Sequence, residues 1–385
     1  MPFLIGGIYM NDTEFIEKLK QKRFACDYSQ ARLARELSIN RQNLNEIENG
    51  KVKASREMQR LLLHYLDYCK CEQPFTLMID YLRIRFPTTD TLEIIKNILA
   101  MKKEYFIYED YGLYGYEKQY IFGEIIVMAS KEPSMGVLLE LRGMGCRHLE
   151  NVLQARKIGW YDFLNLCTAY KGIVKRFDLA VNDMGGLLDI AVLRERYYEN
   201  KVYKRSKKFE AVNSGSLIGN DKDTARTFYI GSQNSSLYFC LYEKEKEQKK
   251  KGIQTDIKNR FEIRLKNQKA KETVERFLLT GSLREVVTTL IETQIYFTDY
   301  ILWDIFLENI QTSLPLITVP VAVNMDKTLR WIKRQVMPSI VMIKEIEKKT
   351  DTHYLKDIRE HTQLTEKQEL KIKQMITKID DIIET

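Results

Sequence analysis

The strongest constraint on the fold is the stretch from Arg226 to Lys244, which has the pattern of two strands joined by a tight turn. In its second half the side chains alternate with a period of two residues, which is typical of a strand with one buried face. Tyr242 is therefore expected at the end of a strand, on the face opposite the core side chains. The two alternating sets are Leu237, Phe239 and Leu241 on one face, and Tyr238, Cys240 and Tyr242 on the other.

Two further stretches repeat this alternation, with acidic residues in place of the tyrosine. Asp178 lies in residues 174–181, and Glu262 lies in residues 260–266. If these strands share a sheet with the first, Asp178, Tyr242 and Glu262 are expected together on its open face. Two carboxylates suit a hard divalent cation, and a tyrosine beside such a cation is able to attack a phosphodiester. The three stretches therefore predict a site for phosphodiester cleavage, surrounded by Arg176, Arg260 and Arg264.

Residues 11–71 have the apolar spacing of four short helices. Ser29 and Asn40 are suited to cap the second and third helices, and Gly50 is suited to the left-handed residue that ends the third. The run from Ser29 to Gly50 resembles the helix-turn-helix of phage Cro and repressor proteins. In that family the second helix of the motif enters the major groove, and its first residues contact base edges. The resemblance implies DNA contacts by Gln30, Arg41, Gln42, Asn43 and Asn45, whereas the alternative is a helical module for protein contacts.

Beyond this first domain the order of strands and helices is mixed, with several neighbouring strands that read as hairpins. Residues 75–86 alternate as a strand, whereas residues from about 271 onward have helical apolar spacing with a kink or a break at Pro338. This order predicts an α+β fold with an all-α helix-turn-helix domain, a central antiparallel-sheet domain and a helical C-terminal region. The expected domain boundaries are 11–71, 74–270 and 271–385.

The chain has a modest excess of positive charge, with 61 basic and 53 acidic residues. The excess alone does not establish nucleic-acid binding, but basic runs at 201–209 and 244–251 flank the hairpin. Tyr203 and Phe209 are interleaved with the first run, which favours a groove for a phosphate backbone. The candidate DNA contacts in this run are Lys204, Arg205, Lys207 and Lys208, and a solvated surface is the alternative.

The cysteines and the apolar segments indicate the cellular compartment. Six cysteines occur without CxxC spacing or a disulfide-like framework. No apolar run approaches 20 residues, and the first ten residues lack the basic leader of a signal peptide. A cytoplasmic protein with reduced thiols is therefore expected.

The histidine content limits the kind of metal site. The chain has four histidines, and none shows the histidine–hydrophobe–histidine spacing with which many tyrosine nickases hold their metal. A metal must then rely on carboxylates, which favours Mg²⁺ or Mn²⁺ over zinc. No Walker loop and no Rossmann glycine pattern is present in the sequence.

Short motifs in a consistent order across residues 74–340 resemble two related families. These are the Rep_trans-like rolling-circle replication initiators of Gram-positive plasmids and the MobT relaxases of integrative conjugative elements. The motifs are ArgPheAspLeuAla at 176–180, TyrIleGlySer at 229–232, LeuTyrGluLys at 241–244 and PheGluIleArgLeuLys at 261–266.

The resemblance implies a role for each matching residue. Tyr242 is the expected nucleophile, which attacks a DNA phosphate and leaves a 5′-phosphotyrosine and a free 3′-hydroxyl. Asp178 and Glu262 are the expected metal ligands, with Glu140 and Asp183 as further candidates. Tyr229 and Tyr238 are alternative nucleophiles, because one precedes the turn and the other shares the face of Tyr242. The alternative for the carboxylates is ion pairing with neighbouring arginines, a common arrangement on strands.

MobT relaxases often have a Cro-like domain in front, which the plasmid initiators generally lack. The resemblance therefore implies a metal-dependent conjugative relaxase that nicks one strand at a transfer origin and remains attached to it. The alternatives are a rolling-circle plasmid or phage replication initiator, and a DNA-binding regulator without catalysis. The expected partners are single- and double-stranded origin DNA, with a coupling ATPase, a helicase or accessory relaxosome proteins.

Overall fold

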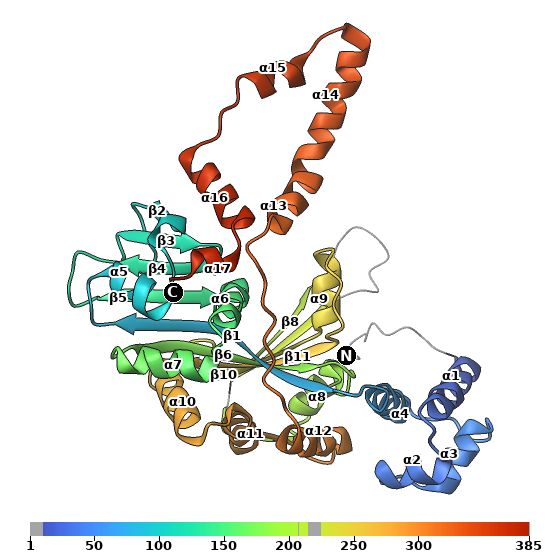
Figure 1. The fold of residues 1–385 in the computed structure, drawn as a ribbon. Helices are drawn as coiled ribbons and strands as arrows, with labels where there is room; N and C mark the ends of the chain where they lie inside the picture. The colour runs from blue at the N-terminus through green and yellow to red at the C-terminus, as the bar shows by residue number, and fades with distance from the viewer. Residues whose placement is uncertain (1–10, 207, 215–224, 385) are drawn as a thin grey trace. The chain divides into compact units, whose positions relative to one another are not determined.

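A computed structural model describes residues 11–206, 208–214 and 225–384. The chain divides into two compact units, one comprising Met1–Asp80 and Lys175–Ile317 and the other comprising Tyr81–Val174 and Thr318–Thr385. Helices at the N-terminus, antiparallel strands in the middle and helices at the C-terminus confirm the predicted α+β class (Figure 1). Among the described helices, none is long and apolar enough to cross a bilayer.

The N-terminal helices form the predicted helix-turn-helix domain. They are α1 (Asp12–Ala25), α2 (Gln30–Glu36), α3 (Arg41–Glu48) and α4 (Arg56–Tyr68). The Ser29 hydroxyl accepts the Arg32 N–H at 3.1 Å, and the Asn40 side chain accepts the Gln42 N–H at 2.7 Å. Gly50 has a φ of +70°, which a residue with a Cβ rarely adopts. These features confirm the caps and the turn that the sequence predicts.

Helix α4 joins this domain to the rest of the first unit through His64. Its Nδ1 donates to the Gly186 carbonyl, and its Nε2 lies 3.2 Å from the Asp189 carboxylate. Asp189 also caps α8 (Ile190–Tyr198) by accepting the Ala191 N–H at 3.0 Å. Burial alone would lower the pKa of His64, but Asp189 and the Gly186 carbonyl raise it to about 9. The imidazolium is thus part of the contact between α4 and the loop before α8.

We expect this contact to depend on pH. The pKa of His64 is raised above its ordinary 6.5, so its stabilising effect is complete below pH 6.5 and is lost as the pH rises through about 9. Because the ring is one-third exposed, the effect should be about 1 kcal/mol. Unfolding midpoints of wild type and His64→Gln should differ at pH 6 and converge by about pH 10. Replacing exposed His353 by Gln should change neither midpoint, and an equal difference at both pH values would contradict the assignment.

The sheet of the first unit contains the N-terminal half of β1 (Phe75–Phe86) and five further strands beyond it. In spatial order they are β6 (Ile173–Asp183), β11 (Asn259–Lys266), β10 (Leu237–Tyr242), β9 (Ala225–Ile230) and β8 (Phe209–Ser214). The pairing places Tyr242 opposite Arg260, and Arg260 opposite Asn182. The three stretches singled out in the sequence are therefore adjacent strands.

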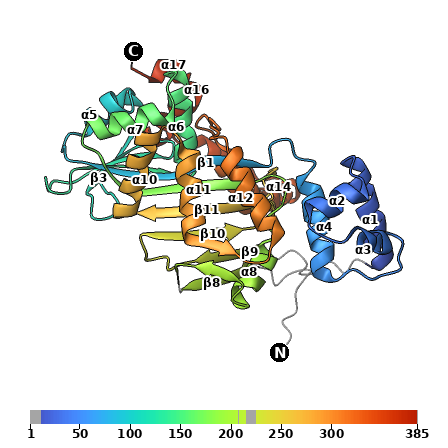
Figure 2. The ribbon, with the colours of Figure 1, turned by 90° about the horizontal axis from the view of Figure 1, so that it is seen from below.

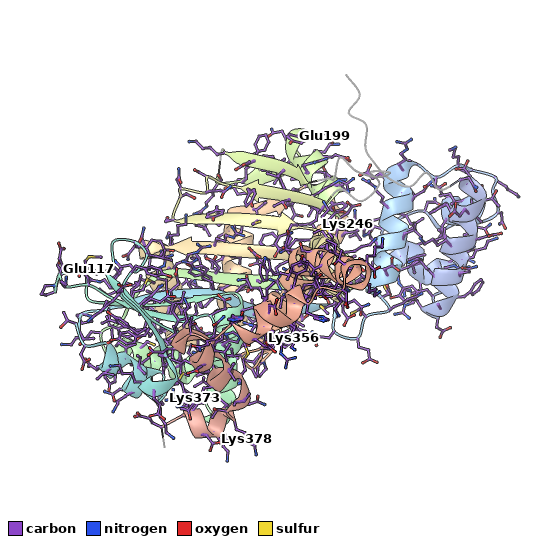
Figure 3. All side chains as sticks on the ribbon, turned by 90° about the horizontal axis from the view of Figure 1, so that it is seen from above. Glu117, Glu199, Lys246, Lys356, Lys373 and Lys378 are labelled. Atoms are coloured by element: carbon purple, nitrogen blue, oxygen red, sulfur yellow. The ribbon has the colours of Figure 1, made fainter. Side chains whose placement is uncertain are left out.

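Three helices cover one face of this sheet, as Figure 2 shows: α10 (Asn267–Thr280), α11 (Leu283–Gln294) and α12 (Ile301–Thr312). The Phe261 ring lies 5.3 Å from the Phe239 ring on the neighbouring strand, and 6.2 Å and 6.1 Å from the Trp303 and Phe306 rings of α12. The core side chains thus occupy the helix-covered face, because that face excludes water. Figure 3 views the sheet from the opposite side, with Lys246 and Glu199 labelled.

Two short elements of the first unit were not anticipated. Strand β7 (Val202–Lys204) pairs with β12 (Ile295–Phe297), so part of the basic run belongs to a two-stranded ribbon. Helix α9 (Lys244–Lys250) begins two residues after Tyr242. Lys244 is therefore held at the start of a helix beside that tyrosine.

The sheet of the second unit has the order β2 (Ile107–Glu109), β3 (Lys118–Phe122), β4 (Ile125–Ala129), β5 (Val137–Arg142) and the C-terminal half of β1 (Phe75–Phe86). Its helices are the short α5 (Thr91–Glu93), η1 (Ile94–Ile98) and η2 (Lys103–Tyr105), and the longer α6 (Met144–Ala155) and α7 (Trp160–Ala169).

The C-terminal helices extend away from this sheet and return to it (Figure 1). The outward part has α13 (Asp326–Trp331), η3 (Ile332–Val336), α14 (Met337–Thr350) and α15 (Tyr354–Glu360). Pro338 lies in the first turn of α14, and α13, η3 and α14 follow one another without a gap, so the helix does not break there and its irregularity is the π-helical turn η3 before the proline. The returning part has α16 (Glu366–Ile376) and α17 (Ile379–Ile382), and Gln374 fastens it by donating to the carbonyls of Tyr105 and Ile121 at 2.6 Å and 2.9 Å.

Candidate active site

Tyr242 lies at the end of β10 on the face away from the core helices. Its hydroxyl donates to Glu262 Oε1 at 2.7 Å, and Lys244 Nζ lies 3.4 Å from the same oxygen. Burial and the Glu262 carboxylate raise the pKa of Tyr242 well above its ordinary value, and Arg260 offsets this only in part. The phenol therefore keeps its proton at neutral pH and directs it at a carboxylate that is able to accept it.

Glu262 occupies the middle of β11 and is almost fully buried. Its second oxygen, Oε2, accepts Arg264 Nη2 and Nε at 2.7 Å and 2.9 Å. Arg260 Nη1 lies 3.9 Å from Oε1. One oxygen of the carboxylate thus faces the tyrosine, while the other is held by an arginine on the same strand.

Asp178 lies on β6 opposite Arg264, so it is a diagonal neighbour of Glu262 on the same face of the sheet. Arg176 holds it through two N–H groups, with Nη2 2.6 Å and Nε 3.0 Å from Oδ2. Burial raises the pKa of Asp178 to about 6, although Arg176 and Arg264 act against this. The structure therefore brings Asp178, Tyr242 and Glu262 together on one face, as the alternation predicts.

Arg260 connects this site to two residues that sequence reasoning missed. Its Nε donates to Asn182 Oδ1 at 2.8 Å, and its Nη1 lies 3.3 Å from Asp80 Oδ1. Asp80 is partly exposed and contributes to the electrostatic environment of both Tyr242 and Lys244. The sequence feature that could have identified Asp80 as a site residue is its position as an acidic residue at the end of the mainly apolar run ThrLeuMetIleAsp of β1.

The carboxylates of this site have the ligand chemistry that Mg²⁺ and Mn²⁺ prefer. Each oxygen of Asp178 and Glu262 already accepts a hydrogen bond, from Arg176, Arg264 or Tyr242. Within the described residues no group of three His, Cys, Asp or Glu side chains is arranged to hold a metal. The residues fit such a cation by their chemistry, and holding it would require Arg176 and Arg264 to turn away.

The other candidate residues of the first unit have different surroundings. Tyr238 is buried with its hydroxyl 3.5 Å from Arg264 Nη1. Tyr229 lies opposite Cys240, and burial raises its pKa to about 12. Asp183 is fully buried and accepts the N–H groups of residues 186–188 at 2.7–3.0 Å, so it organises a turn.

Glu140 lies on β5 of the second unit and is completely buried. It accepts Arg83 Nε at 2.9 Å and Arg142 Nη2 at 2.6 Å. Burial acts against ionisation, but these arginines and Tyr81 hold the pKa of Glu140 below its ordinary value. Its hydrogen-bonding capacity is occupied by cationic and phenolic groups of its own unit.

The helix-turn-helix places four of its five candidate residues on the surface. Arg41, Gln42, Asn43 and Asn45 are exposed on α3. Gln30 instead donates to Glu48 Oε2 at 2.7 Å. Glu48 Oε1 also accepts Arg23 Nε at 2.7 Å. Part of the Gln30 side chain therefore connects α2 to α3.

The basic run divides into inward and outward residues. Lys204 Nζ lies 3.5 Å from the centre of the Tyr197 ring, and burial lowers the pKa of Lys204. Arg205 and Lys208 are exposed, whereas Lys207 lies outside the described residues.

Three family descriptions match successive parts of the sequence. Residues 19–71 match "Helix-turn-helix", residues 76–166 match "Rolling Circle replication initiation protein N-terminal domain", and residues 172–358 match "Replication initiation factor". These matches confirm the resemblance that the short motifs indicated.

Two individual proteins support the same relationship. The chain is 29% identical over 330 residues to "Putative DNA relaxase NicK" of Bacillus subtilis (strain 168), which covers 81% of this chain and 93% of that protein. The rolling circle replication initiator protein from Geobacillus stearothermophilus has a similar solved structure, with a TM-score of 0.56 and 25% sequence identity. That similarity covers 63% of this chain and 99% of the initiator.

Proposed function

We propose that this chain, which resembles rolling-circle replication initiation factors and a DNA relaxase and matches a helix-turn-helix at its N-terminus, nicks one strand of DNA through Tyr242. The observation that supports this most directly is the 2.7 Å hydrogen bond from the Tyr242 hydroxyl to Glu262. Among the tyrosines on this sheet face, Tyr242 is the one that donates to a carboxylate in the described structure.

In the proposed reaction the Tyr242 oxygen attacks a phosphodiester phosphorus while Glu262 takes its proton. A bond forms between the phenolic oxygen and phosphorus, and the bond to the 3′-oxygen breaks. The product is a 5′-phosphotyrosine and a 3′-hydroxyl, which acquires its proton from solvent. Lys244 and Arg260 supply positive charge beside the phenolic oxygen as it loses its proton.

A divalent cation held by Asp178 and Glu262 would polarise the scissile phosphate and reduce the negative charge that the nucleophile meets. Asp80 is a third carboxylate within reach of Arg260 and belongs to the same electrostatic neighbourhood. A guanidinium group such as that of Arg264, once turned away from its carboxylate, has the donor geometry for DNA phosphates.

We infer a conjugative relaxase as the biological role. The support is the fusion of the helix-turn-helix to the nicking region and the similarity that spans 93% of a protein described as a DNA relaxase. A replication initiator is the second candidate, because the similar solved structure is that of a rolling circle initiator. The two roles differ in whether the nicked strand is passed to a recipient cell or copied in place.

The test is a cleavage assay on supercoiled DNA that contains the origin of the protein's own element, with Mg²⁺, Mn²⁺ or EDTA. We expect a nicked circle with protein bound to its 5′ end, formed with a metal and not in EDTA. Peptide mass spectrometry of the adduct should assign the DNA to the peptide that contains Tyr242. Origin binding without a nick under any of these conditions would contradict the proposal and favour a DNA-binding regulator.

We also propose that Gln42 and its neighbours on α3 read bases at the origin. Gln42 is exposed near the start of α3 and has the amide geometry for two hydrogen bonds to adenine. Gln42→Ala should weaken origin binding by about 1–3 kcal/mol and relax base preference at one position. Gln335→Ala, an exposed glutamine of η3, is the matched control in the same electrophoretic assay. Equal affinities for wild type and Gln42→Ala would exclude this contact.

A further inference from the structure

The second unit contains an arginine–tyrosine cluster built on Glu140. Besides Arg83 and Arg142, this completely buried carboxylate accepts the hydroxyls of Tyr81 and Tyr114, the latter at 3.1 Å. Two guanidinium groups thus share one carboxylate, which leaves the cluster with one net positive charge. The carboxylate is buried, so it is stabilised by these ion pairs, while the excess positive charge lies on arginines that are partly exposed.

Strand register places this cluster on one face of the sheet. Arg83 of β1 lies opposite Glu140 of β5, and Tyr81 lies opposite Arg142. The cluster is open at one side, because the Arg142 side chain is 43% exposed while Glu140 beneath it is inaccessible. The carboxylate therefore orients an arginine whose side chain is partly open to solvent.

The loop at residues 110–117 adds aromatic side chains to this surface. Tyr111 and Tyr114 are 57% and 52% exposed, and Leu113 between them is also exposed. The Tyr114 ring lies 4.0 Å from the Arg83 guanidinium carbon, and its hydroxyl accepts Arg142 Nη2 at 3.0 Å. The end of the loop is marked by Glu117 in Figure 3.

The conformation of this loop is fixed by its neighbours. Tyr114 has a φ of +57°, which is unfavourable for a bulky residue and persists only where the surroundings hold it. Tyr116 is buried against Met128 and Leu138, and its hydroxyl donates to the Met135 carbonyl at 3.0 Å. An exposed aromatic side chain is thus held at a defined place beside two arginines.

We propose that Arg83, Arg142 and the aromatic loop form a binding site for single-stranded DNA, with Glu140 as its positioning residue. Aromatic rings stack with bases of any sequence, and arginine forks bind phosphates in pairs of hydrogen bonds. The site suits the strand that a nickase must hold, so the inference rests on the proposed function. It assigns Glu140 to DNA binding in place of metal binding.

The other roles for this cluster account for less of the structure. A metal ligand would need free carboxylate oxygens, but those of Glu140 are shared among four described donors. A purely stabilising ion-pair network would explain Glu140, Tyr81 and Arg83. It would not explain an exposed tyrosine in a left-handed conformation that is held over an arginine.

The test measures the affinity of the full chain for a labelled oligothymidine of about 20 nucleotides, longer than the ~4–16 that one single-strand site covers. Binding is measured in EDTA, so that it is independent of nicking and of metal. Tyr114→Ala and Arg142→Ala should each weaken binding about tenfold, as expected for one stacked base or one bidentate phosphate contact. The controls are Tyr354→Ala and Arg359→Ala, which remove exposed residues of α15 in the same unit.

The dependence on salt separates the two contributions. Loss of one phosphate contact should reduce the slope of log affinity against log salt by about 0.7, whereas loss of a stacked base should leave it unchanged. Arg142→Ala should therefore lower the slope, and Tyr114→Ala should not. Tyr114 is exposed on a loop, so we expect Tyr114→Ala to fold normally. This variant therefore tests the site even if Arg142→Ala lowers the stability of the protein.

Affinities equal to wild type in both variants, or losses no larger than those of the two controls, would overturn the inference. Supercoiled DNA cleavage measured in parallel distinguishes this result from failure of the proposed function. If wild type cleaves DNA and the variants bind oligothymidine as tightly as wild type, the single-stranded DNA site is rejected and the nickase proposal stands. Weaker binding in the variants without cleavage by wild type supports the site and rejects the nickase.

Discussion

Replacing Tyr242 by Phe should abolish both nicking and the covalent adduct while origin binding remains unchanged. The substitution removes one oxygen, which is the atom that would attack phosphorus, and leaves the ring in the same place on β10. Loss of the nucleophile should reduce the nicking rate by at least about 10³-fold, since water alone would have to replace it in the same site. The measurement is the rate of nicked-circle formation under metal-saturated conditions.

Two neighbouring tyrosines are the matched controls. Tyr238→Phe removes a hydroxyl that lies near Arg264, and Tyr229→Phe removes one from the adjacent strand β9. Both variants should keep the adduct. If Tyr242→Phe still forms it while one of these loses it, the nucleophile is the other tyrosine and the proposed mechanism is wrong in that respect.

Replacing Glu262 by Gln should reduce nicking by about 10²–10⁴-fold, the usual contribution of a positioned proton acceptor. Glutamine keeps the shape of the side chain but has no negative charge to accept the Tyr242 proton or to hold a cation. The variant should also show a lower pKa for Tyr242, because the Glu262 carboxylate raises it together with burial and Asp80. The measurement is the rate of nicked-circle formation, as for Tyr242→Phe.

Glu245→Gln is the control for Glu262. Glu245 is a surface residue of α9 whose partner, Lys258, is about equally exposed, so its loss should leave the nicking rate unchanged. A Glu262→Gln protein that folds, binds the origin and nicks at the wild-type rate would exclude Glu262 from the reaction.

Alternation with a period of two was sufficient to place Asp178, Tyr242 and Glu262 on one face, because side chains on a strand must alternate between its faces. The same argument placed Phe239 and Phe261 in the core, where their rings meet. The helix-turn-helix could also be predicted from the sequence, since its caps at Ser29 and Asn40 depend on local sequence. These parts of the fold are determined by short stretches of chain.

Contacts between stretches that are distant in the chain could not be predicted in this way. The sequence does not show that Asp80 approaches Arg260, because the two residues are far apart in the chain and meet only through strand order. A carboxylate on a strand is able to bind a metal ion or to form ion pairs with arginines, and the sequence pattern is the same in both cases. Glu140 was therefore a candidate ligand, whereas in the structure it accepts hydrogen bonds from Arg83 and Arg142. Lys204 belongs to a basic run, but pairing of β7 with β12 turns its side chain toward Tyr197.

The contact through His64 attaches the helix-turn-helix domain to the loop before α8, within the first unit. Helix α4 is fastened to the loop between β6 and α8, and β6 carries Asp178 to the nicking site. The helix-turn-helix domain, which we propose reads base pairs at the origin, is therefore attached to the loop between β6 and α8. Since DNA turns once in about 10–10.5 base pairs, an origin must present its binding sequence and its cleavage position in matching helical phase. Under the proposed function, the number of base pairs between them is then part of what the protein recognises.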